Sequence, residues 1–533
     1  MKQKLAMVAA LVPVAYSLIF PAELSAARRT QSGPQVVYDS YHDTSLPVRE
    51  YSMGVPQGGR RHEVEHPRPR RILASATVRV TDRAEQTYIA QPVAAGIGLN
   101  FEGIPNSANG QALEGVPSDS NLAVGATQVV ETINTAYQVY DKVTGKTVFG
   151  PQQISAIFTG LPGLCGQGVH SFNYTDPIIL YDQTANRWIM TIIGSNSNFT
   201  EGNECIAVSE GSDATGKYYR YVYKFGTNVF NDYDKLSVWP DAFYASYNLF
   251  GPNNYLGADA CAYDRTAMLS GAPAKAICFV NTNEYSYLPS NLDGSTPPPS
   301  GEPNFFLDLF SSTALHLYRF HVDFTTPKNS TFTGPIKITV DAYTMACGGG
   351  VCIPQPDTTR KIDSLGDRLM FRLAYRNFGD HESLVANHSV LTSKAASGAR
   401  WYEIRDPNGT PTVYQQGTVT NGGNSLWMGS IAMDKAGDMA LGFSASNSAT
   451  LHPSVVFTGR VPGDGVNTME SLKTIFPAKG SETDTDRWGD YTSMVIDPSD
   501  DCTFWYVDQY MPSTGSGLNF HTRIASLKFQ SCQ

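Results

Sequence analysis

The sequence has few charged residues and lacks the common catalytic motifs. Charged side chains make up 17% of its 533 residues. After the N-terminal segment, no apolar stretch reaches the roughly 18 residues that would span a bilayer. There is no GxSxG nucleophile elbow, Walker loop or dinucleotide-binding fingerprint. These absences argue against a membrane-spanning protein and give no support to serine-hydrolase, nucleotide or dinucleotide chemistry.

The chain also lacks the excess positive charge that nucleic acids and anionic membranes attract. Its formal net charge is -10, and an acidic body repels both. The arginines at 60–61 and 68–71 are too few and too near the terminus to reverse this. We therefore expect no nucleic-acid partner and no membrane partner, and we expect a monomer.

The N-terminal segment is typical of an export signal. Lys2 and Lys4 precede an apolar run over residues 5–20, and small residues follow at 25–27. The pattern predicts a signal peptide over residues 1–27, cleaved near Ala27, with a retained anchor as the alternative. The mature protein is then soluble and secreted, to the extracellular space or the periplasm.

Eight cysteines agree with an oxidising destination. Pairing each with its neighbour would form four local disulfide loops, although the sequence leaves the connectivity open. A zinc site at Cys347 and Cys352 is the alternative, but these two have no second ligand pair at the required spacing. The cysteines are Cys165, Cys205, Cys261, Cys278, Cys347, Cys352, Cys502 and Cys532.

One local plan recurs along the chain: an apolar strand ending at Asp, a short polar turn and another apolar strand. It is found in the stretches 139–149, 180–190, 432–442 and 487–510. An Asp that bonds its own backbone, followed by Gly, Asn or Asp, is a β-hairpin signal. The recurrence indicates one architecture repeated.

The spacing of these units predicts an all-β protein with almost no long helix. Anchoring strands are expected about 40 to 70 residues apart, which suits four-stranded sheets and long loops. A β-propeller of about seven blades is our first interpretation, and β-sandwich domains are the alternative. The anchors are Tyr137, Ile178, Phe243, Leu315, Leu369, Ile431 and Met494.

The predicted domain organisation has three parts. Residues 1–27 form the signal peptide, residues 28–75 form a flexible N-terminal extension or pro-segment rich in Arg and Pro, and residues 76–533 form a single propeller domain. Within the propeller, residues 264–271 could form a short helix.

The most polar stretch within an apolar strand covers residues 363–390. If Arg368, Arg372 and Arg376 lie on one strand, they share a face. They could hold an anionic group of a substrate, or pair with acidic residues of a neighbouring blade. Asp380, His381 and Glu382 follow on a predicted turn.

Aromatic residues beside charged ones open several units. Such groups would gather around a propeller axis and suit sugar rings, although tryptophans also pack between blades. From this pattern we predict substrate-binding roles for Arg372, Arg376, Arg487, Trp239, Trp427 and Trp488.

Acid-base chemistry on a glycosidic bond needs two carboxyl groups about 5 to 10 Å apart. Elimination from a uronic acid would instead need a base such as His381 or Tyr375 with a charge-neutralising Arg372. The catalytic candidates are Asp176, Asp241, Asp380, His381, Glu382 and Asp490. The predicted function is a glycoside hydrolase or lyase acting on extracellular polysaccharide, and the alternative is a non-catalytic module that binds glycan or protein.

Metal signals are weak. The stretch HEVEH at 62–66 matches a zinc-protease pattern, but it lies in the Pro-rich extension, where coincidence is the better interpretation. No cofactor is expected, although calcium is possible where acidic residues cluster on turns. These clusters are Glu482, Asp484 and Asp486, and Asp497, Asp500 and Asp501.

Three stretches, at 363–385, 425–444 and 486–506, resemble the core of secreted bacterial β-propellers related to the sialidase and BNR-repeat superfamily. SDATGKYY at 212–219 is similar to the Asp-box hairpin of that superfamily. The resemblance spans roughly residues 117–529 and implies the fold and export more than an activity. The arginine triad and the Tyr–Glu pair expected of a sialidase cannot be placed in this sequence.

Overall fold

The computed structural model describes residues 31–51, 79–88, 91–108, 111–112, 115–167 and 174–533. The predicted signal peptide and the HEVEH stretch lie outside these residues. No helix of the described part is long and apolar enough to cross a membrane.

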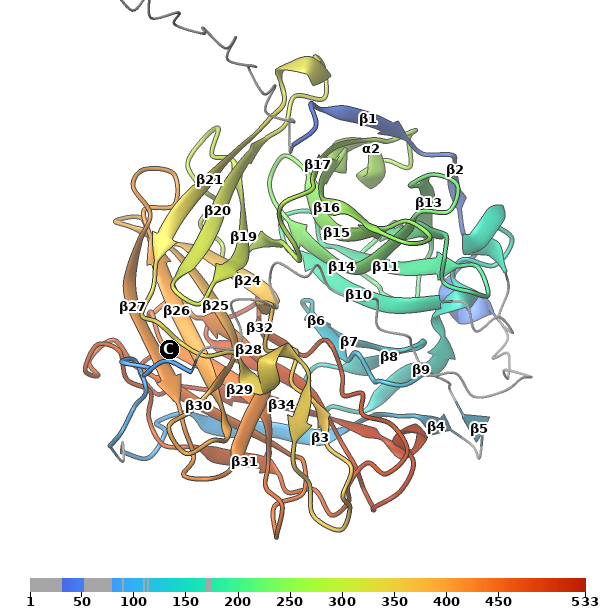
Figure 1. Cartoon of the computed structure of the whole chain (residues 1–533). Coiled ribbons are helices and arrows are strands. Elements are labelled where there is room, and N and C mark those ends of the chain that lie inside the picture. Colours follow the sequence, from blue (N-terminus) through green and yellow to red (C-terminus); the bar gives the residue numbers. More distant parts are fainter. Residues whose placement is uncertain (1–30, 52–78, 89–90, 109–110, 113–114, 168–173) are drawn as a thin grey trace, which may run out of the picture.

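Seven blades of antiparallel strands surround one axis (Figure 1), and blades 4 and 5 belong to one eight-stranded sheet because their first strands pair in parallel. Blade 1 contains β6 (Asn121–Val124), β7 (Gln128–Ile133), β8 (Ala136–Asp141) and β9 (Thr147–Gln153). Blade 2 contains β10 (Tyr174–Asp182), β11 (Arg187–Ser195), β12 (Gly202–Ser209) and β13 (Tyr218–Lys224). Blade 3 contains β14 (Phe230–Val238), β15 (Phe243–Phe250), β16 (Tyr255–Tyr263) and β17 (Lys275–Asn281). Blade 4 contains β18 (Leu288–Leu292), β19 (Asn304–Ser311), β20 (Ala314–His321) and β21 (Thr331–Thr339).

The last three blades complete the ring. Blade 5 contains β24 (Met370–Asn377), β25 (Glu382–Leu391), β26 (Ser397–Arg405) and β27 (Thr412–Val419). Blade 6 contains β28 (Ser425–Met433), β29 (Met439–Ser446), β30 (Ser454–Arg460) and β31 (Lys473–Phe476). Blade 7 contains β32 (Ser493–Ile496), β33 (Thr503–Tyr510), β34 (His521–Lys528) and, from the N-terminal side, β3 (Gly96–Pro105).

Smaller elements lie between or beside the blades. They are β4 (Ser107–Ala108), β5 (Gln111–Ala112), β22 (Val351–Ile353), β23 (Ile362–Asp363), the helix α2 (Arg265–Leu269), and the 3-10 turns η1 (Val48–Glu50), η2 (Ile154–Ala156), η3 (Gly163–Gly166), η4 (Pro327–Asn329), η5 (Ala346–Gly349) and η6 (Gly517–Asn519). The short helix expected within residues 264–271 is thus present as α2, with Asp264 accepting a hydrogen bond from the Ala267 N–H at its start.

The contacts between first strands decide between a propeller and a sandwich. β6 contacts β10, β10 contacts β14, and the series continues through β18, β24, β28 and β32 back to β6. Such a closed circle of first strands is a propeller, because two stacked sheets would leave it open. The predicted fold class, with seven blades, is confirmed.

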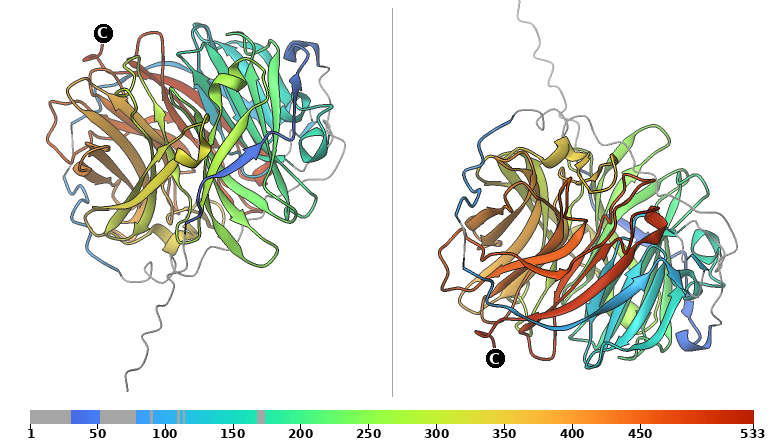
Figure 2. Two further views of the ribbon diagram at one scale, coloured as in Figure 1. Left: turned by 90° about the horizontal axis from the view of Figure 1, so that it is seen from above. Right: turned by 90° about the horizontal axis from the view of Figure 1, so that it is seen from below.

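The two ends of the chain close the ring together. β3 runs antiparallel to β34 as the outermost strand of blade 7, with Ile97 opposite Leu527 and Phe101 opposite Ile524. Figure 2 shows this blue strand beside the red C-terminal strand. The pairing joins segments more than 400 residues apart, so blade 7 is complete only with a strand from the N-terminal part of the propeller.

Apolar side chains fill the spaces between neighbouring blades. One cluster joins strands of blades 3, 4 and 5 and contains Phe306, Phe320 and Tyr375. Another joins blades 6 and 7 through Phe457 and Tyr506. Strands buried on both faces explain why the sequence shows continuous apolar runs more often than strict alternation.

The sequence-derived anchors fall one in each blade, but not always on the innermost strand. Ile178, Ile431 and Met494 lie on innermost strands, and Leu369 directly precedes one. Tyr137, Phe243 and Leu315 were also expected on leading strands, and this was wrong: they lie on β8, β15 and β20. Blade repeats give several similar hairpins, so periodicity does not reveal which strand of a hairpin faces the axis.

Part of the predicted flexible extension is ordered. β1 (Gln35–Tyr38) pairs with β17, and β2 (Tyr41–Thr44) pairs with β13. The prediction of flexibility was therefore wrong for these residues. β17 and β13 are the outer strands of blades 3 and 2, and an outer strand has backbone groups without partners in its own blade. β1 supplies those partners to β17, and β2 supplies them to β13.

All eight cysteines form disulfides, and the connectivity that the sequence left open is the nearest-neighbour one. Cys165 pairs with Cys205, Cys261 with Cys278, Cys347 with Cys352, and Cys502 with Cys532. The zinc alternative at Cys347 and Cys352 is excluded because their sulfurs are bonded to each other. The last bridge fastens the C-terminal end to blade 7, and four disulfides are typical of an oxidising, extracellular type of environment.

Glu131 joins blade 1 to the closing strands and makes ring closure sensitive to pH. Its carboxyl accepts hydrogen bonds from the Ile104 N–H, from Tyr140 and from Thr522. Burial raises the pKa of Glu131 to about 7. The neutral form therefore suits the fold, and this group's contribution to stability is present at low pH and lost as pH rises through about 7.

We predict that Glu131→Gln reduces the loss of stability between pH 5 and pH 8. Glutamine keeps an acceptor oxygen and cannot ionise, so the variant should gain about 3 kcal/mol relative to the wild type over that interval. Urea unfolding at both pH values measures this difference. An equal pH dependence in the two proteins would contradict it.

Candidate functional site

Charged and aromatic residues converge where innermost strands begin. We call this set the axial cluster. Asp119 precedes β6, Asp176 lies on β10, and Asp234 and Lys235 lie on β14; the others precede β32. All are at most 7% exposed. The axial cluster consists of Asp119, Asp176, Asp234, Lys235, Arg487, Asp490 and Tyr491.

A repeated backbone irregularity directs side chains toward the axis. The ladder between the first two strands shifts register near Asp176 in blade 2, Tyr233 in blade 3 and Met428 in blade 6. These residues have φ of 55°, 55° and 50°, in the left-handed region that glycine favours. Bulges re-aim side chains and recur beside active sites. The same bulge with a positive φ occurs in three blades, which indicates that the axis is a candidate functional site.

Tyr491 connects two carboxyl groups from different blades. Its Oη lies 2.8 Å from Asp176 Oδ2 and 3.3 Å from Asp234 Oδ1. Thr175 also donates to Asp176, and Thr191 donates to Asp234. Since both carboxyl oxygens reach one hydroxyl, they lie at most about 6 Å apart, a limit that includes the roughly 5–5.5 Å between the carboxyl groups of retaining glycosidases.

A second group of carboxyls lies beside the first. Asp119 accepts hydrogen bonds from the Asp490 N–H at 2.7 Å and from the side chain of Asn134. Arg487 forms an ion pair with Asp490 at 2.8 Å. Asn134 also accepts a hydrogen bond from the Asp176 N–H, which links the two groups.

Lys235 supplies a buried cation between aromatic rings. Its Nζ lies 3.0 Å from the centre of the Tyr233 ring and 3.9 Å from that of Tyr491. It donates to the backbone carbonyl of Asp234 at 2.8 Å. Burial lowers the pKa of Lys235 to about 7, with the charges of Asp234 and Asp176 opposing that change.

Burial and mutual repulsion separate the proton affinities of the acids. Burial, followed by the charge of Asp232, raises the pKa of Asp176 to about 6. Burial and the charge of Asp176 raise the pKa of Asp234 well above its ordinary value. Burial and the charges of Asp490 and Asp176 do the same for Asp119. Burial therefore favours the protonated form of both acids, and the repulsion between Asp176 and Asp234 opposes ionisation of both at once.

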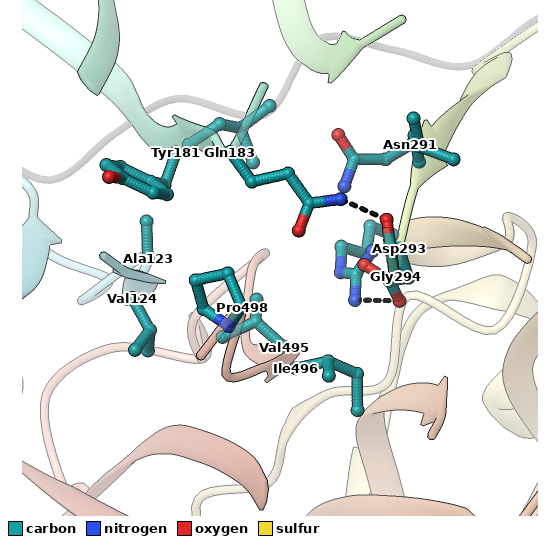
Figure 3. Close-up of a pocket in the computed structure, with 13 residues that line it drawn as sticks. Ala123, Val124, Tyr181, Gln183, Asn291, Asp293, Gly294, Val495, Ile496 and Pro498 are labelled. Atoms are coloured by element: carbon teal, nitrogen blue, oxygen red, sulfur yellow. Dashed lines mark hydrogen bonds and ion pairs between the residues drawn. The ribbon is translucent and has the colours of Figure 1, made fainter. Parts of the chain in front are cut away.

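The opposite end of the axis contains a small cavity, and a second cavity of about 230 Å³ that shares Tyr181, Gln183 and Pro498 lies beside it. The small cavity, of about 40 Å³, lies at the ends of β6, β10, β18 and β32. Figure 3 shows its lining, in which Arg372 pairs with Asp293 and Gln183 bonds to the Gly294 carbonyl. This volume holds a few water molecules, whereas ligand sites occupy several hundred Å³.

The structure brings three of the predicted site residues together and separates the others. Asp176, Asp490 and Arg487 belong to the axial cluster. Asp380 and His381 lie on the turn between β24 and β25, where they pair with each other and the Asp380 side chain is 83% exposed. A catalytic pair of Asp380 and Asp490 is thus not formed.

Two further acidic candidates lie away from the axial cluster. Glu382 begins β25 and accepts a hydrogen bond from Tyr375. Asp241 lies on the turn after β14, where Tyr244 donates to it at 3.2 Å. Both turns follow the innermost strands, at the end opposite to the axial cluster.

Arg368, Arg372 and Arg376 pair with acidic residues of the protein, which is the second of the two roles considered for them. Arg372 forms an ion pair with Asp293 at 2.6 Å and donates to the Met494 carbonyl. Arg376 binds Asp501 through two nitrogens. Arg368 contacts Asp367 and lies over the Tyr233 ring. These guanidinium groups hold neighbouring chain segments together.

The three tryptophans are buried and cannot serve as open sugar platforms in this arrangement. Trp239 packs edge to face against Tyr375, with ring centres 4.7 Å apart. Trp427 and Trp488 lie 5.8 Å apart in an apolar cluster near the axis. All three are at most 1% exposed, so they pack between blades.

The acidic turns proposed for calcium have protein partners. Asp497 pairs with Lys142, Asp500 with Lys528 and Asp501 with Arg376. Glu482 accepts hydrogen bonds from the backbone N–H groups of Asp484 and Thr485. Calcium binding at either turn stays a prediction.

Sequence reasoning missed Asp119, Asp234 and Lys235 as site residues, and it noted Tyr491 without giving it a role. In blade 3 the sequence pattern indicates Phe243 as the anchor, which lies on β15, and this points to the adjacent Asp241. The innermost strand is β14, which contains Asp234. A usable signal was present: an acidic residue directly before or within the first apolar strand of a blade, as at Asp119 and Asp176.

Comparison with known proteins gives distant similarity only. No family model and no curated protein sequence matches the chain. The N-terminal domain of Nup159 has a TM-score of 0.37 at 9% identity, covering 85% of this chain and 100% of that one. The α-L-arabinofuranosidase Arb93A from Fusarium graminearum has a TM-score of 0.36 at 9% identity, covering 82% and 99%.

An exo-β-1,3-galactanase from Phanerochaete chrysosporium has a TM-score of 0.30 at 10% identity, covering 86% of this chain and 97% of that one. Two of these three similar structures are thus glycoside hydrolases by name. At these values neither a reaction nor a site residue transfers to this chain, and the assignment of seven blades rests on its own strand contacts.

We predict that Tyr491→Phe destabilises the protein by about 1–3 kcal/mol, because two buried carboxyl groups lose their shared hydroxyl. The matched control is Tyr38→Phe, whose ring is 70% exposed and should change stability little. Urea unfolding at pH 6 compares the three proteins. A Tyr491→Phe variant as stable as the control would show that the hydroxyl does not hold the cluster together.

Proposed function

We propose that this protein is an exported enzyme that hydrolyses glycosidic bonds in extracellular polysaccharide, with the axial cluster as its acid-base site. The observation that supports the proposal is the pairing of Asp176 and Asp234 through Tyr491. A carboxylate and a carboxylic acid held close together at one site are what hydrolysis of a glycosidic bond requires.

The two acids have different roles in this proposal. Asp234 keeps its proton near neutral pH and donates it to the departing glycosidic oxygen. Asp176 is ionised and attacks the sugar carbon or stabilises the charge that develops there. Environments that separate two pKa values are how paired carboxyl groups divide such work.

The surrounding groups support the ionised form of Asp176. Hydrogen bonds from Thr175 and Tyr491 and the charge of Lys235 stabilise its carboxylate. Arg487 and Asp490 stand beside the pair, where a guanidinium can contact an acidic or hydroxyl-rich sugar. A lyase reaction is the variant of this proposal in which Lys235 or Tyr491 takes the proton next to a uronic carboxylate.

One observation favours a second candidate, a non-catalytic module that binds glycan or protein. Asp119, Asp176 and Asp234 are at most 1% exposed, as residues with a purely structural role would be. Loops of the propeller would then carry the binding. Kinship with the sialidase superfamily also stays a prediction.

Activity assays on a panel of glycans decide between these candidates. Reducing-end release reports hydrolysis, and absorbance of an unsaturated product reports elimination. We expect Asp176→Asn to lower kcat at least about 1,000-fold, because the ionised partner of the pair is lost. Asp380→Asn is the matched control, since its carboxyl is exposed and outside the cluster, and it should retain wild-type activity.

The pH profile gives an independent check. Asp176 has a pKa of about 6, so activity should rise as pH increases through that value and fall where Asp234 loses its proton. An Asp176→Asn variant with wild-type activity would refute the assignment. Glycan binding without turnover in wild type would support the binding module instead.

A further inference from the structure

A buried group of ligand-type side chains lies outside the axial cluster, in blade 4. Glu284 belongs to the turn between β17 and β18, Asp308 lies on β19, and His316 lies on β20 directly opposite Asp308 in the antiparallel register. Their exposed fractions are 5%, 2% and 6%. The group combines two carboxyls and an imidazole close to the surface.

The three side chains converge on one point. One oxygen or nitrogen from each lies within 4.8 Å of the other two. His316 Nδ1 lies 2.9 Å from Glu284 Oε1, and Tyr318 donates to the same oxygen at 2.8 Å. The His316 ring stacks on Phe310 with ring centres 3.7 Å apart, which fixes its orientation.

Asp308 provides a second, independent observation. Its carboxyl accepts hydrogen bonds from the backbone N–H groups of Tyr285 and His316 and shares a hydrogen bond with Glu284, and its buried Oδ1 has no other hydrogen-bond partner. No lysine or arginine of the described residues forms an ion pair with Asp308 or Glu284. Two neighbouring buried carboxyl groups with an unsatisfied oxygen need a proton or a cation to be stable.

Two other groups of similar composition lack this combination. Asp259 lies beside Cys261 and Cys278, but these sulfurs form a disulfide and cannot act as thiolate ligands. Asp434 and Asp438 form a carboxyl pair without an imidazole, and Ser531 donates to Asp438. The blade 4 group is the one with an oriented nitrogen ligand.

We infer that Glu284, Asp308 and His316 bind one divalent transition-metal ion of the Zn²⁺ or Mn²⁺ type. Mixed carboxylate and imidazole ligands suit these ions, whereas calcium prefers oxygen ligands alone. Water completes the coordination. The cation neutralises the carboxyl pair and occupies the position that the free Asp308 oxygen faces.

The proposed ion would fix a turn that reaches the axial cluster. Tyr285 follows Glu284, and the Arg368 guanidinium carbon lies 5.4 Å from its ring centre. The same group lies 4.6 Å from the Tyr233 ring, next to Lys235. The metal therefore orders the wall of the axial cluster without being part of it, and the inference does not depend on the proposed reaction.

Metal content and thermal stability test the inference directly. The purified protein is treated with EDTA, dialysed, incubated with Zn²⁺ or Mn²⁺ and analysed by elemental mass spectrometry. We expect about one tightly held ion per chain and a rise in Tm with added metal, since a ligand that binds only the folded state stabilises it. Asp308→Asn and His316→Gln should lose both effects.

The variants separate metal loss from misfolding. Asp308→Asn removes one of two neighbouring buried carboxyl groups, and its amide can still donate to Glu284. The variant should therefore fold at least as well as the metal-free wild type, as judged by near-ultraviolet circular dichroism. If it does not fold, His316→Gln, which leaves the carboxyl pair intact, decides the question. Asp438→Asn is the control and should keep the metal. Wild type without bound metal, or metal retained in His316→Gln, would overturn the inference.

Discussion

Closure of the ring is the constraint on which this structure depends. The innermost strands of seven blades contact each other in a complete circle, and β3 from the N-terminal side supplies the outer strand of blade 7. The ladder between β3 and β34 therefore joins the beginning of the domain to its end. Glu131 reinforces this joint by accepting hydrogen bonds from Ile104 of β3 and Thr522 of β34.

Closure also creates the electrostatics of the axis. Seven strands that begin around one point bring polar side chains from distant parts of the sequence into a space with little water. Burial then raises the pKa values of Asp119, Asp176 and Asp234. Tyr491 and Lys235 hold these groups in fixed positions, and bulges at Asp176 and Tyr233 set the direction of the chain. The polarity of the axis is thus a product of the ring.

Blade 4 shows the same principle on a smaller scale. A turn and the two middle strands of the blade place two carboxyl groups and an imidazole together, and the turn continues into Tyr285 beside Arg368. Cation–π contacts then connect Arg368 to Tyr233 and Lys235. A series of direct contacts therefore connects the blade 4 group to the axial cluster.

The sequence by itself determined the β-hairpin repeats, the approximate number of blades and an oxidising destination for the eight cysteines, because turn residues and composition act locally. It left the pairing of the cysteines open. It also indicated Asp176, Asp490 and Arg487. Only the tertiary structure decided which strand of each hairpin faces the axis. It selected Asp234 over Asp241, placed Asp380 and Glu382 away from the axial cluster and buried the tryptophans in packing contacts. The reason is geometric: a strand's distance from the axis depends on how all seven blades close, and no local pattern contains that information.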